Sequence, residues 1–197
     1  MTKQSRNART LSFIALVVLV FIVLITLPRL LERRLFKYTA SEISLEKPKP
    51  FPMERALASL SRPGTRTTLG ELAKAHKSGL IVNFWATWCP PCLEELPSLN
   101  RFDQQLRAQG RELPLVVTIS VDDTPKEVQT LLASLPYRPG FLVLHDPRGE
   151  LAISLGSRRY PETYWIRPSG EVIHKWLGPQ DWLSETVLKV LAAPPSP

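Results

Sequence analysis

Hydrophobic and polar residues alternate along this chain in a pattern typical of a mixed α/β domain. Two short, mostly apolar runs, Leu80–Trp85 and Leu115–Val121, predict strands buried at the centre of a sheet. Strands and helices alternate and then give way to a hairpin and a last helix, so we expect an α/β sandwich with a mixed central sheet. The other predicted elements are a helix from about Thr68 to Lys77, a helix that ends near Gln109, a helix at Pro125–Leu135, a strand at Phe141–Leu144, a helical turn at Gly149–Leu155, strands at Thr163–Arg167 and Glu171–Trp176, and a helix at Trp182–Leu191.

One apolar run near the start of the chain differs from the others in its length and its flanks. Residues 10–28 carry no charge, and as a helix they would span roughly 28 Å, close to the thickness of a bilayer's hydrocarbon core. Clustered Lys and Arg flank the run, and no small-residue cleavage site precedes Arg29. We therefore expect one uncleaved transmembrane helix rather than a buried helix or a cleaved signal peptide. The predicted organisation is a basic N-terminus at 1–9, the anchor at 10–28, a basic flank and Pro-rich linker at 29–54, the folded domain at 55–192 and a disordered tail at 193–197.

The net charge of +7 is unevenly distributed over the 197 residues. Residues 1–37 hold seven Lys and Arg and one acidic residue, which gives +6, and the other 160 hold 18 basic and 17 acidic residues, which gives +1. The folded part is thus nearly neutral, and a spread-out nucleic-acid-binding surface is not expected. Positive charges on the two sides of the anchor are close to balanced, so they do not decide the membrane topology. A composition with 44% hydrophobic residues excludes disorder of the whole chain.

The two cysteines of the chain, Cys89 and Cys92, are three positions apart. They could form a metal site, a structural disulfide or a redox pair. Two cysteines do not complete a tetrahedral zinc site, and no histidine is near them in the sequence. A structural disulfide that closes so short a loop would constrain the unfolded chain little. Their place between a predicted strand and a predicted helix favours the redox pair.

The predicted helix start bears on the reactivity of the two thiols. Cys89 stands where an N-cap residue would stand, so the positive end of the helix favours its thiolate, which is the reactive form. Cys92 lies one turn inside the helix and is expected to be more buried, where it can resolve a mixed disulfide. Pro90 and Pro91 lack backbone N–H groups. We therefore expect Cys89 to be only moderately acidified, which favours a reductant over a strong oxidant.

The segment Asn83–Pro97, with the sequence NFWATWCPPCLEELP, closely resembles thioredoxin-like reductases of the TlpA/ResA/CcmG type. The resemblance covers about residues 55–192 and implies a thioredoxin-like sandwich tethered outside a bacterial cytoplasmic membrane. It implies that Cys89 attacks substrate disulfides and that Cys92 resolves the mixed disulfide. It also matches Pro161 with a cis-proline that faces the cysteine pair, a turn at which the chain can offer strand-like hydrogen bonds to a peptide.

Glu95 follows Cys92 by three positions, so it can face the same side of the helix. In ResA-like proteins the matching carboxylate lies close to the site and tunes thiol acidity, and a buried carboxylate can shuttle a proton. A solvated position is the alternative for Glu95 and the expectation for Glu94. Asn83 stands where cytoplasmic thioredoxins carry a buried acid, which leaves Glu95 as the better candidate.

The segment before Pro161 departs from the family pattern, which more often has a small apolar residue there. Tyr160 would narrow the substrate groove or stack over it. Arg158 and Arg159 would either favour acidic partners or belong to a solvated loop. We expect Trp88 to be partly exposed beside the site. The predicted substrate contacts are Trp88, Pro90, Pro91, Tyr160 and Pro161, and the tryptophans expected in the core are Trp85, Trp165 and Trp176.

These observations predict a membrane-tethered, extracytoplasmic thiol–disulfide oxidoreductase. It would reduce exported proteins such as apocytochrome c, and the resemblance implies that a membrane thiol transporter of the DsbD or CcdA type supplies its electrons. No bound cofactor or metal is expected beyond the redox-active Cys89–Cys92 disulfide. The alternatives are a disulfide oxidase, a metallochaperone that holds Cu(I) between the two thiolates, and a peptide-binding module without turnover.

Overall fold

The computed structural model describes residues 50–109 and 113–192. The elements of the described residues, in chain order, are β1 (Leu57–Ser59), β2 (Arg66–Thr67), α2 (Leu69–Lys74), β3 (Leu80–Trp85), α3 (Pro90–Gln109), β4 (Leu115–Ser120), α4 (Pro125–Ser134), β5 (Leu142–His145), the 3₁₀ turn η1 (Pro147–Gly149), α5 (Glu150–Ser154), β6 (Glu162–Ile166), β7 (Val172–Leu177) and α6 (Glu185–Ala192). The predicted anchor, the linker up to residue 49 and the tail lie outside these residues.

In the described part of the chain, one sheet of seven strands has the order β2-β1-β5-β4-β3-β6-β7. The central strands β5, β4 and β3 are parallel, and β1, β6 and β7 pair antiparallel with their neighbours. The mixed sheet predicted from the sequence is therefore confirmed. Trp85 is in register with Ser120, and Ser120 with His145, so the three parallel strands end together at one edge. Loops at such an edge commonly build ligand and substrate sites.

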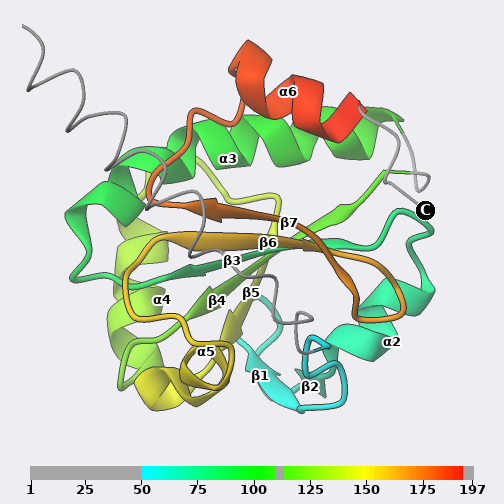
Figure 1. Ribbon diagram of the computed structural model, residues 1–197. Helices are drawn as coiled ribbons and strands as arrows, with labels where there is room; N and C mark the ends of the chain where they lie inside the picture. Colours follow the sequence, from blue (N-terminus) through cyan, green and yellow to red (C-terminus); the bar gives the residue numbers. More distant parts are fainter. Residues whose placement is uncertain (1–49, 110–112, 193–197) are drawn as a thin grey trace, which may run out of the picture. The chain divides into compact units, whose positions relative to one another are not determined.

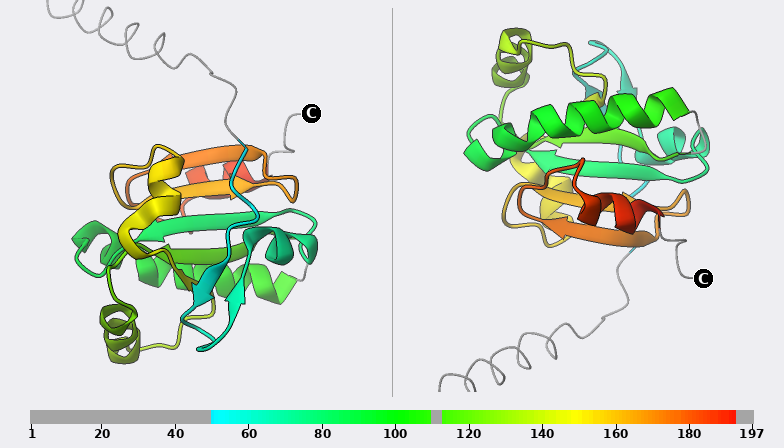
Figure 2. Two further views of the ribbon diagram at one scale, coloured as in Figure 1. Left: turned by 90° about the horizontal axis from the view of Figure 1, so that it is seen from below. Right: turned by 90° about the horizontal axis from the view of Figure 1, so that it is seen from above.

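Helices cover both faces of this sheet. Figures 1 and 2 show α3 and α6 on one face and α2 and α5 on the other. The long helix α3 begins just after β3 and packs along β4. Its first turn therefore lies at the edge where the parallel strands end, and its last turn lies at the opposite end of the domain.

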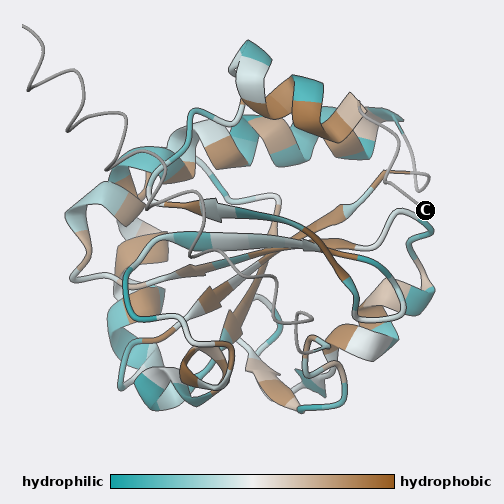
Figure 3. Cartoon of the chain, in the orientation of Figure 1, coloured by the Kyte–Doolittle hydropathy of each residue, from teal (hydrophilic) through white to brown (hydrophobic). Residues whose placement is uncertain are grey.

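Apolar side chains of the central strands fill the space between the layers. Every residue of β3 is buried, and Figure 3 shows brown strands between helices that carry both brown and teal segments. Burial of each large apolar side chain contributes about 1.5–3 kcal/mol. Packing begins at Phe51, which is buried and donates its backbone N–H to the carbonyl of Gly170. The tryptophans expected in the core, Trp85, Trp165 and Trp176, are buried.

Two differences from the predicted elements have local causes. The hairpin β1–β2 was not predicted, because strands of three and two residues are too short to show an alternating pattern. The helix predicted from Trp182 begins later, at Glu185. Asp181 accepts hydrogen bonds from the backbone N–H groups of Leu183 and Ser184, which holds this segment in a turn. Trp182 is fully buried within that turn.

Among residues 50–109 and 113–192, the structure contains no helix that is both long enough and apolar enough to span a bilayer.

Candidate active site

The two cysteines form a disulfide bond at the start of α3. Cys92 is completely buried and Cys89 retains 5% exposure, so Cys89 is the one within reach of a partner, as predicted. The carbonyl oxygen of Cys89 accepts hydrogen bonds from the N–H groups of Cys92 and Leu93, which is how an N-cap residue begins a helix. Pro90 and Pro91 occupy the first two helical positions, where proline is tolerated.

The loop in front of Cys89 is tied to the end of the neighbouring strand. Both carboxylate oxygens of Asp122 lie 3.1 Å from the backbone nitrogen of Thr87, and the Thr87 hydroxyl donates to Asp122 Oδ1 at 2.6 Å. The Ser120 hydroxyl donates to Asp122 Oδ2 at 2.7 Å. Asp122 is fully buried, and these hydrogen bonds occupy both of its side-chain oxygens. This carboxylate therefore positions the segment that carries Trp88 and Cys89.

The Tyr160–Pro161 peptide bond is cis, as the resemblance predicts. The carbonyl of Pro161 accepts a hydrogen bond from Gly178 N at 3.0 Å. The Tyr160 ring meets the Trp88 ring edge to face, with ring centroids 6.1 Å apart. Trp88 directly precedes Cys89 and Tyr160 directly precedes Pro161, so this contact places the cis-proline segment beside the cysteine segment.

An open cavity of about 460 Å³ adjoins this aromatic pair. Its lining comes from loops that follow β3, β4 and β5 and from the segment before β6: Trp88, Val121, Asp123, Arg148 and Tyr160. Trp88 is 64% exposed, which is unusual for so large an apolar side chain. The cavity and the exposed indole form a surface on which a polypeptide side chain could rest next to the disulfide.

Glu95 lies one helical turn beyond Cys92 and is 3% exposed. Its Oε1 accepts a hydrogen bond from Asn83 Nδ2 at 2.6 Å, and its Oε2 accepts one from the backbone N–H of Gln180 at 2.9 Å. Burial raises the pKa of Glu95 to about 7, although these two neutral donors act in the opposite direction. A carboxyl group with this pKa can take up or release a proton near neutral pH.

Hydrogen bonds hold the segment that follows β7 against α3 near Glu95. Ser98 Oγ donates to the carbonyl of Gln180 at 3.3 Å and accepts from the backbone N–H of Trp182 at 3.4 Å. A depression of about 360 Å³ is lined by Glu95 together with Arg101 and Gln180, among others. Glu95 therefore lies between this depression on the flank of the domain and Asn83 of the buried strand β3.

Comparison with known proteins agrees with this geometry. A model of the Redoxin family matches residues 47–191. The chain belongs to the Redoxin family. The thiol-disulfide oxidoreductase ResA of Oceanobacillus iheyensis is 33% identical over 102 residues, which are 52% of this chain and 50% of that protein. The chain thus spans half the length of this relative.

Other relatives match over a longer stretch. The thiol:disulfide interchange protein HelX of Rhodobacter capsulatus is 30% identical to this redoxin over 165 residues, with 78% of this chain and 88% of that protein covered. A solved structure from Chlorobium tepidum, named as a candidate thiol:disulfide interchange protein DsbE, superposes with a TM-score of 0.60 at 25% identity and covers 75% of this chain and 96% of that one. The redoxin is therefore of the TlpA/ResA/CcmG type, with a thioredoxin-like fold.

The structure brings most of the predicted site residues of this redoxin to one edge of the sheet. Cys89 directly precedes α3, and Cys92 and Glu95 lie in its first two turns. Trp88 contacts Tyr160. Glu94 is exposed, as expected for a solvated acid. Arg158 and Arg159 are exposed too, and neither lines the cavity beside Trp88. Their part in partner choice stays a prediction.

Sequence reasoning missed two groups that hold the site together. Asp122 follows a predicted parallel strand directly, and carboxyl ends of parallel strands meet at one edge, so its position was a usable signal. Gln180 offered no signal, because it contributes its backbone N–H to Glu95 and any residue except proline carries that group.

Proposed function

We propose that this redoxin is a thiol–disulfide oxidoreductase that reduces disulfides in exported proteins. The observation that carries the proposal is the Cys89–Cys92 disulfide at the start of α3, one turn before a buried carboxyl group whose pKa is about 7. The pair itself stores the two electrons of the reaction, so the proposal requires no other cofactor.

The reaction begins with the reduced pair. The Cys89 thiolate attacks one sulfur of a substrate disulfide, which forms a mixed disulfide and releases the other substrate sulfur as a thiolate. Cys92 then loses its proton and attacks Cys89 Sγ, which breaks the mixed disulfide and forms Cys89–Cys92. The substrate gains two electrons and ends with two thiols after protonation, and the redoxin is left oxidised. Glu95 is placed to accept the proton of Cys92 because it follows this residue by one helical turn.

The first turn of α3 supports the reducing direction. Strong acidification of a cysteine at a helix start depends on the positive helix end and on nearby N–H donors. Pro90 and Pro91 supply no N–H group, and the N–H groups of Cys92 and Leu93 both reach the Cys89 carbonyl in this disulfide form. The Cys89 thiolate is thus stabilised only moderately, which keeps the dithiol a good electron donor.

The cellular setting belongs to the same proposal. A dedicated reductant is needed where the surroundings are oxidising, which places the domain outside the cytoplasmic membrane, with the apolar segment 10–28 as its single-pass tether. Electrons would arrive from a membrane thiol transporter of the DsbD or CcdA type. The proposed substrate is the cysteine pair of apocytochrome c, which the resemblance of residues 83–97 to reductases of the TlpA/ResA/CcmG type supports. No nucleic-acid partner is proposed, since residues 38–197 carry a net charge of only +1.

Trapping of the mixed disulfide tests this function. In the full chain expressed in its native cell, Cys92→Ala removes the resolving thiol, so Cys89 should accumulate as a disulfide with its substrate protein. The adducts are separated without reductant and identified by mass spectrometry. Apocytochrome c among them would support the maturation role.

The matched control is Cys89→Ala, which leaves the fully buried Cys92 and should trap far less. Failure of Cys92→Ala to form any adduct beyond this control would contradict the reductase. A reduced pair that binds Cu(I) tightly would favour the metallochaperone instead.

A further inference from the structure

The end of the domain opposite the disulfide contains a second cavity, of about 520 Å³. It is bordered by the last turns of α3, the end of α2, the turn between β1 and β2, and the start of β4. Cys89 follows the carboxyl end of β3, whereas Leu115, at the amino end of the neighbouring parallel strand, lines this cavity. The length of the central strands therefore separates the two sites. The volume lies in the range of pockets that bind small molecules.

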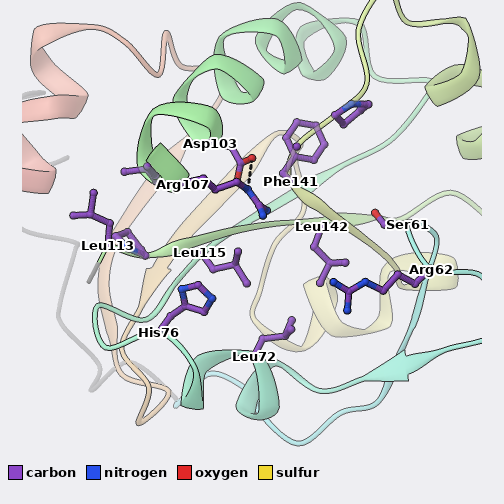
Figure 4. Close-up of a pocket in the computed structure, with 14 residues that line it drawn as sticks. Ser61, Arg62, Leu72, His76, Asp103, Arg107, Leu113, Leu115, Phe141 and Leu142 are labelled. Atoms are coloured by element: carbon purple, nitrogen blue, oxygen red, sulfur yellow. Dashed lines mark hydrogen bonds and ion pairs between the residues drawn. The ribbon is translucent and has the colours of Figure 1, made fainter. Parts of the chain in front are cut away.

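Basic side chains from three separate elements face this cavity. Figure 4 shows the Arg107 guanidinium directed into it from α3, the Arg62 guanidinium from the β1–β2 turn and the His76 imidazole from the end of α2. Among the described residues, the Arg62 guanidinium takes part in none of the ion pairs that the structure contains. Its charge is therefore open to a ligand.

A buried acid fixes the direction of Arg107. Asp103 is 1% exposed and accepts a hydrogen bond from Arg107 Nε at 2.7 Å. Because the pairing uses Nε, the terminal nitrogens of Arg107 remain directed toward the cavity (Figure 4). Two guanidinium groups and one carboxylate leave one net positive charge around the space, without counting His76.

The wall of the cavity at Gly140 packs closely against Asp103. The backbone N–H of Gly140 donates to Asn100 Oδ1 at 2.9 Å, and a Cβ atom at Gly140 would stand 2.5 Å from Asp103 Oδ2. Glycine at this position is thus what lets the wall approach Asp103 so closely. The rest of the lining includes the apolar side chains of Leu72, Leu115, Phe141 and Leu142.

We propose that this cavity binds a small organic monoanion, namely a carboxylate joined to a compact apolar group. The carboxylate would lie between Arg62 and the terminal nitrogens of Arg107, where bidentate pairing is available. The apolar group would rest on the leucine and phenylalanine side chains. The cavity lies far from the disulfide, so this proposal does not depend on the redox reaction.

Titration of the full 197-residue chain with phenylacetate tests the proposal, with backbone amide signals followed by NMR. We expect saturable shifts at Leu72, Gly140 and Leu142. The uncharged analogue 2-phenylethanol should bind at least about tenfold more weakly, because it lacks the charge-assisted contacts.

Substitutions of Arg62 and Arg101 test whether phenylacetate binds in this cavity. Arg62→Ala should weaken phenylacetate binding about tenfold, and Arg62→Lys should recover part of it. Arg101→Ala is the matched control, since this exposed arginine of α3 does not line the cavity, and it should bind as the unchanged chain does. The proposal fails if phenylacetate produces no saturable shift, if 2-phenylethanol binds equally well, or if Arg62→Ala and Arg101→Ala behave alike.

Discussion

Two buried carboxyl groups on the same helix, Glu95 and Asp103, have opposite surroundings. They are eight positions apart on α3, and burial raises the pKa of both. Glu95 accepts hydrogen bonds from neutral groups of Asn83 and Gln180, whereas Asp103 is paired with the cation of Arg107. The comparison shows that burial alone does not define a proton carrier. A carboxyl without a cationic partner can change its protonation near neutral pH, and a paired one serves to hold its partner in place.

The largest expected effect is on the pH dependence of stability. Because the folded-state pKa of Glu95 lies above its unfolded value, the folded chain holds a proton that the unfolded chain has already released. The stabilising contribution is therefore full below about pH 4.5 and is lost as the pH rises through about 7, a change of about 3 kcal/mol. Glutamine at position 95 does not titrate, so Glu95→Gln removes this pH dependence. Urea titrations of both chains between about pH 4.5 and 7 should show the difference between their unfolding free energies changing by about 3 kcal/mol. A constant difference would show that Glu95 titrates normally.

A second prediction concerns the rate at which the reduced pair reacts. Glu95→Gln cannot accept the Cys92 proton, so resolution of the mixed disulfide near neutral pH should slow by about 10²-fold. Stopped-flow measurement of a single turnover with a disulfide peptide gives this rate. Glu94→Gln changes an exposed acid one position earlier and is the matched control, with an expected change below about twofold. Equal rates in the two variants would remove Glu95 from the mechanism.

The smallest expected effect is the loss of stability when Asp103 loses its partner Arg107. Arg107→Ala leaves Asp103 buried without its cation, and because Arg107 is 47% exposed the loss is partly screened by water. We expect the unfolding free energy at neutral pH to fall by about 1–2 kcal/mol. The loss should shrink as the pH falls, since a protonated Asp103 no longer needs a cation. Arg101→Ala should cost less than about 0.5 kcal/mol, and a similar cost for Arg107→Ala would mean that the pair contributes little.

The sequence predicted the disulfide end of the molecule better than the far end. Cys89, Cys92 and Glu95 lie within one helix start, so their mutual placement follows from helical periodicity and from the resemblance of this segment. The strands β3 and β4 were recognisable because short, mostly apolar runs are typical of buried parallel strands. Trp88 was expected to be partly exposed beside the site because it directly precedes Cys89, and its side chain is 64% exposed.

The far cavity could not be predicted in the same way. Arg62, His76 and Arg107 come from different elements, and their meeting depends on how α2, α3 and the β1–β2 turn pack on the sheet. The support that Asp122 and Gln180 give to the active site also crosses between elements, over 35 and 85 positions of the chain. Contacts at such sequence distances leave no periodic signal in a single sequence.

The pKa of Glu95 decides whether this carboxyl group can carry protons for the cysteine pair near neutral pH. The full chain, oxidised and labelled with ¹³C at glutamate side-chain carboxyls, can be titrated by NMR, with Glu95→Gln assigning the signal. Because Glu95 is buried, we expect a titration midpoint near its pKa of about 7. A midpoint near 4.5, the ordinary value for glutamate, would leave Glu95 ionised at neutral pH and contradict its proposed role.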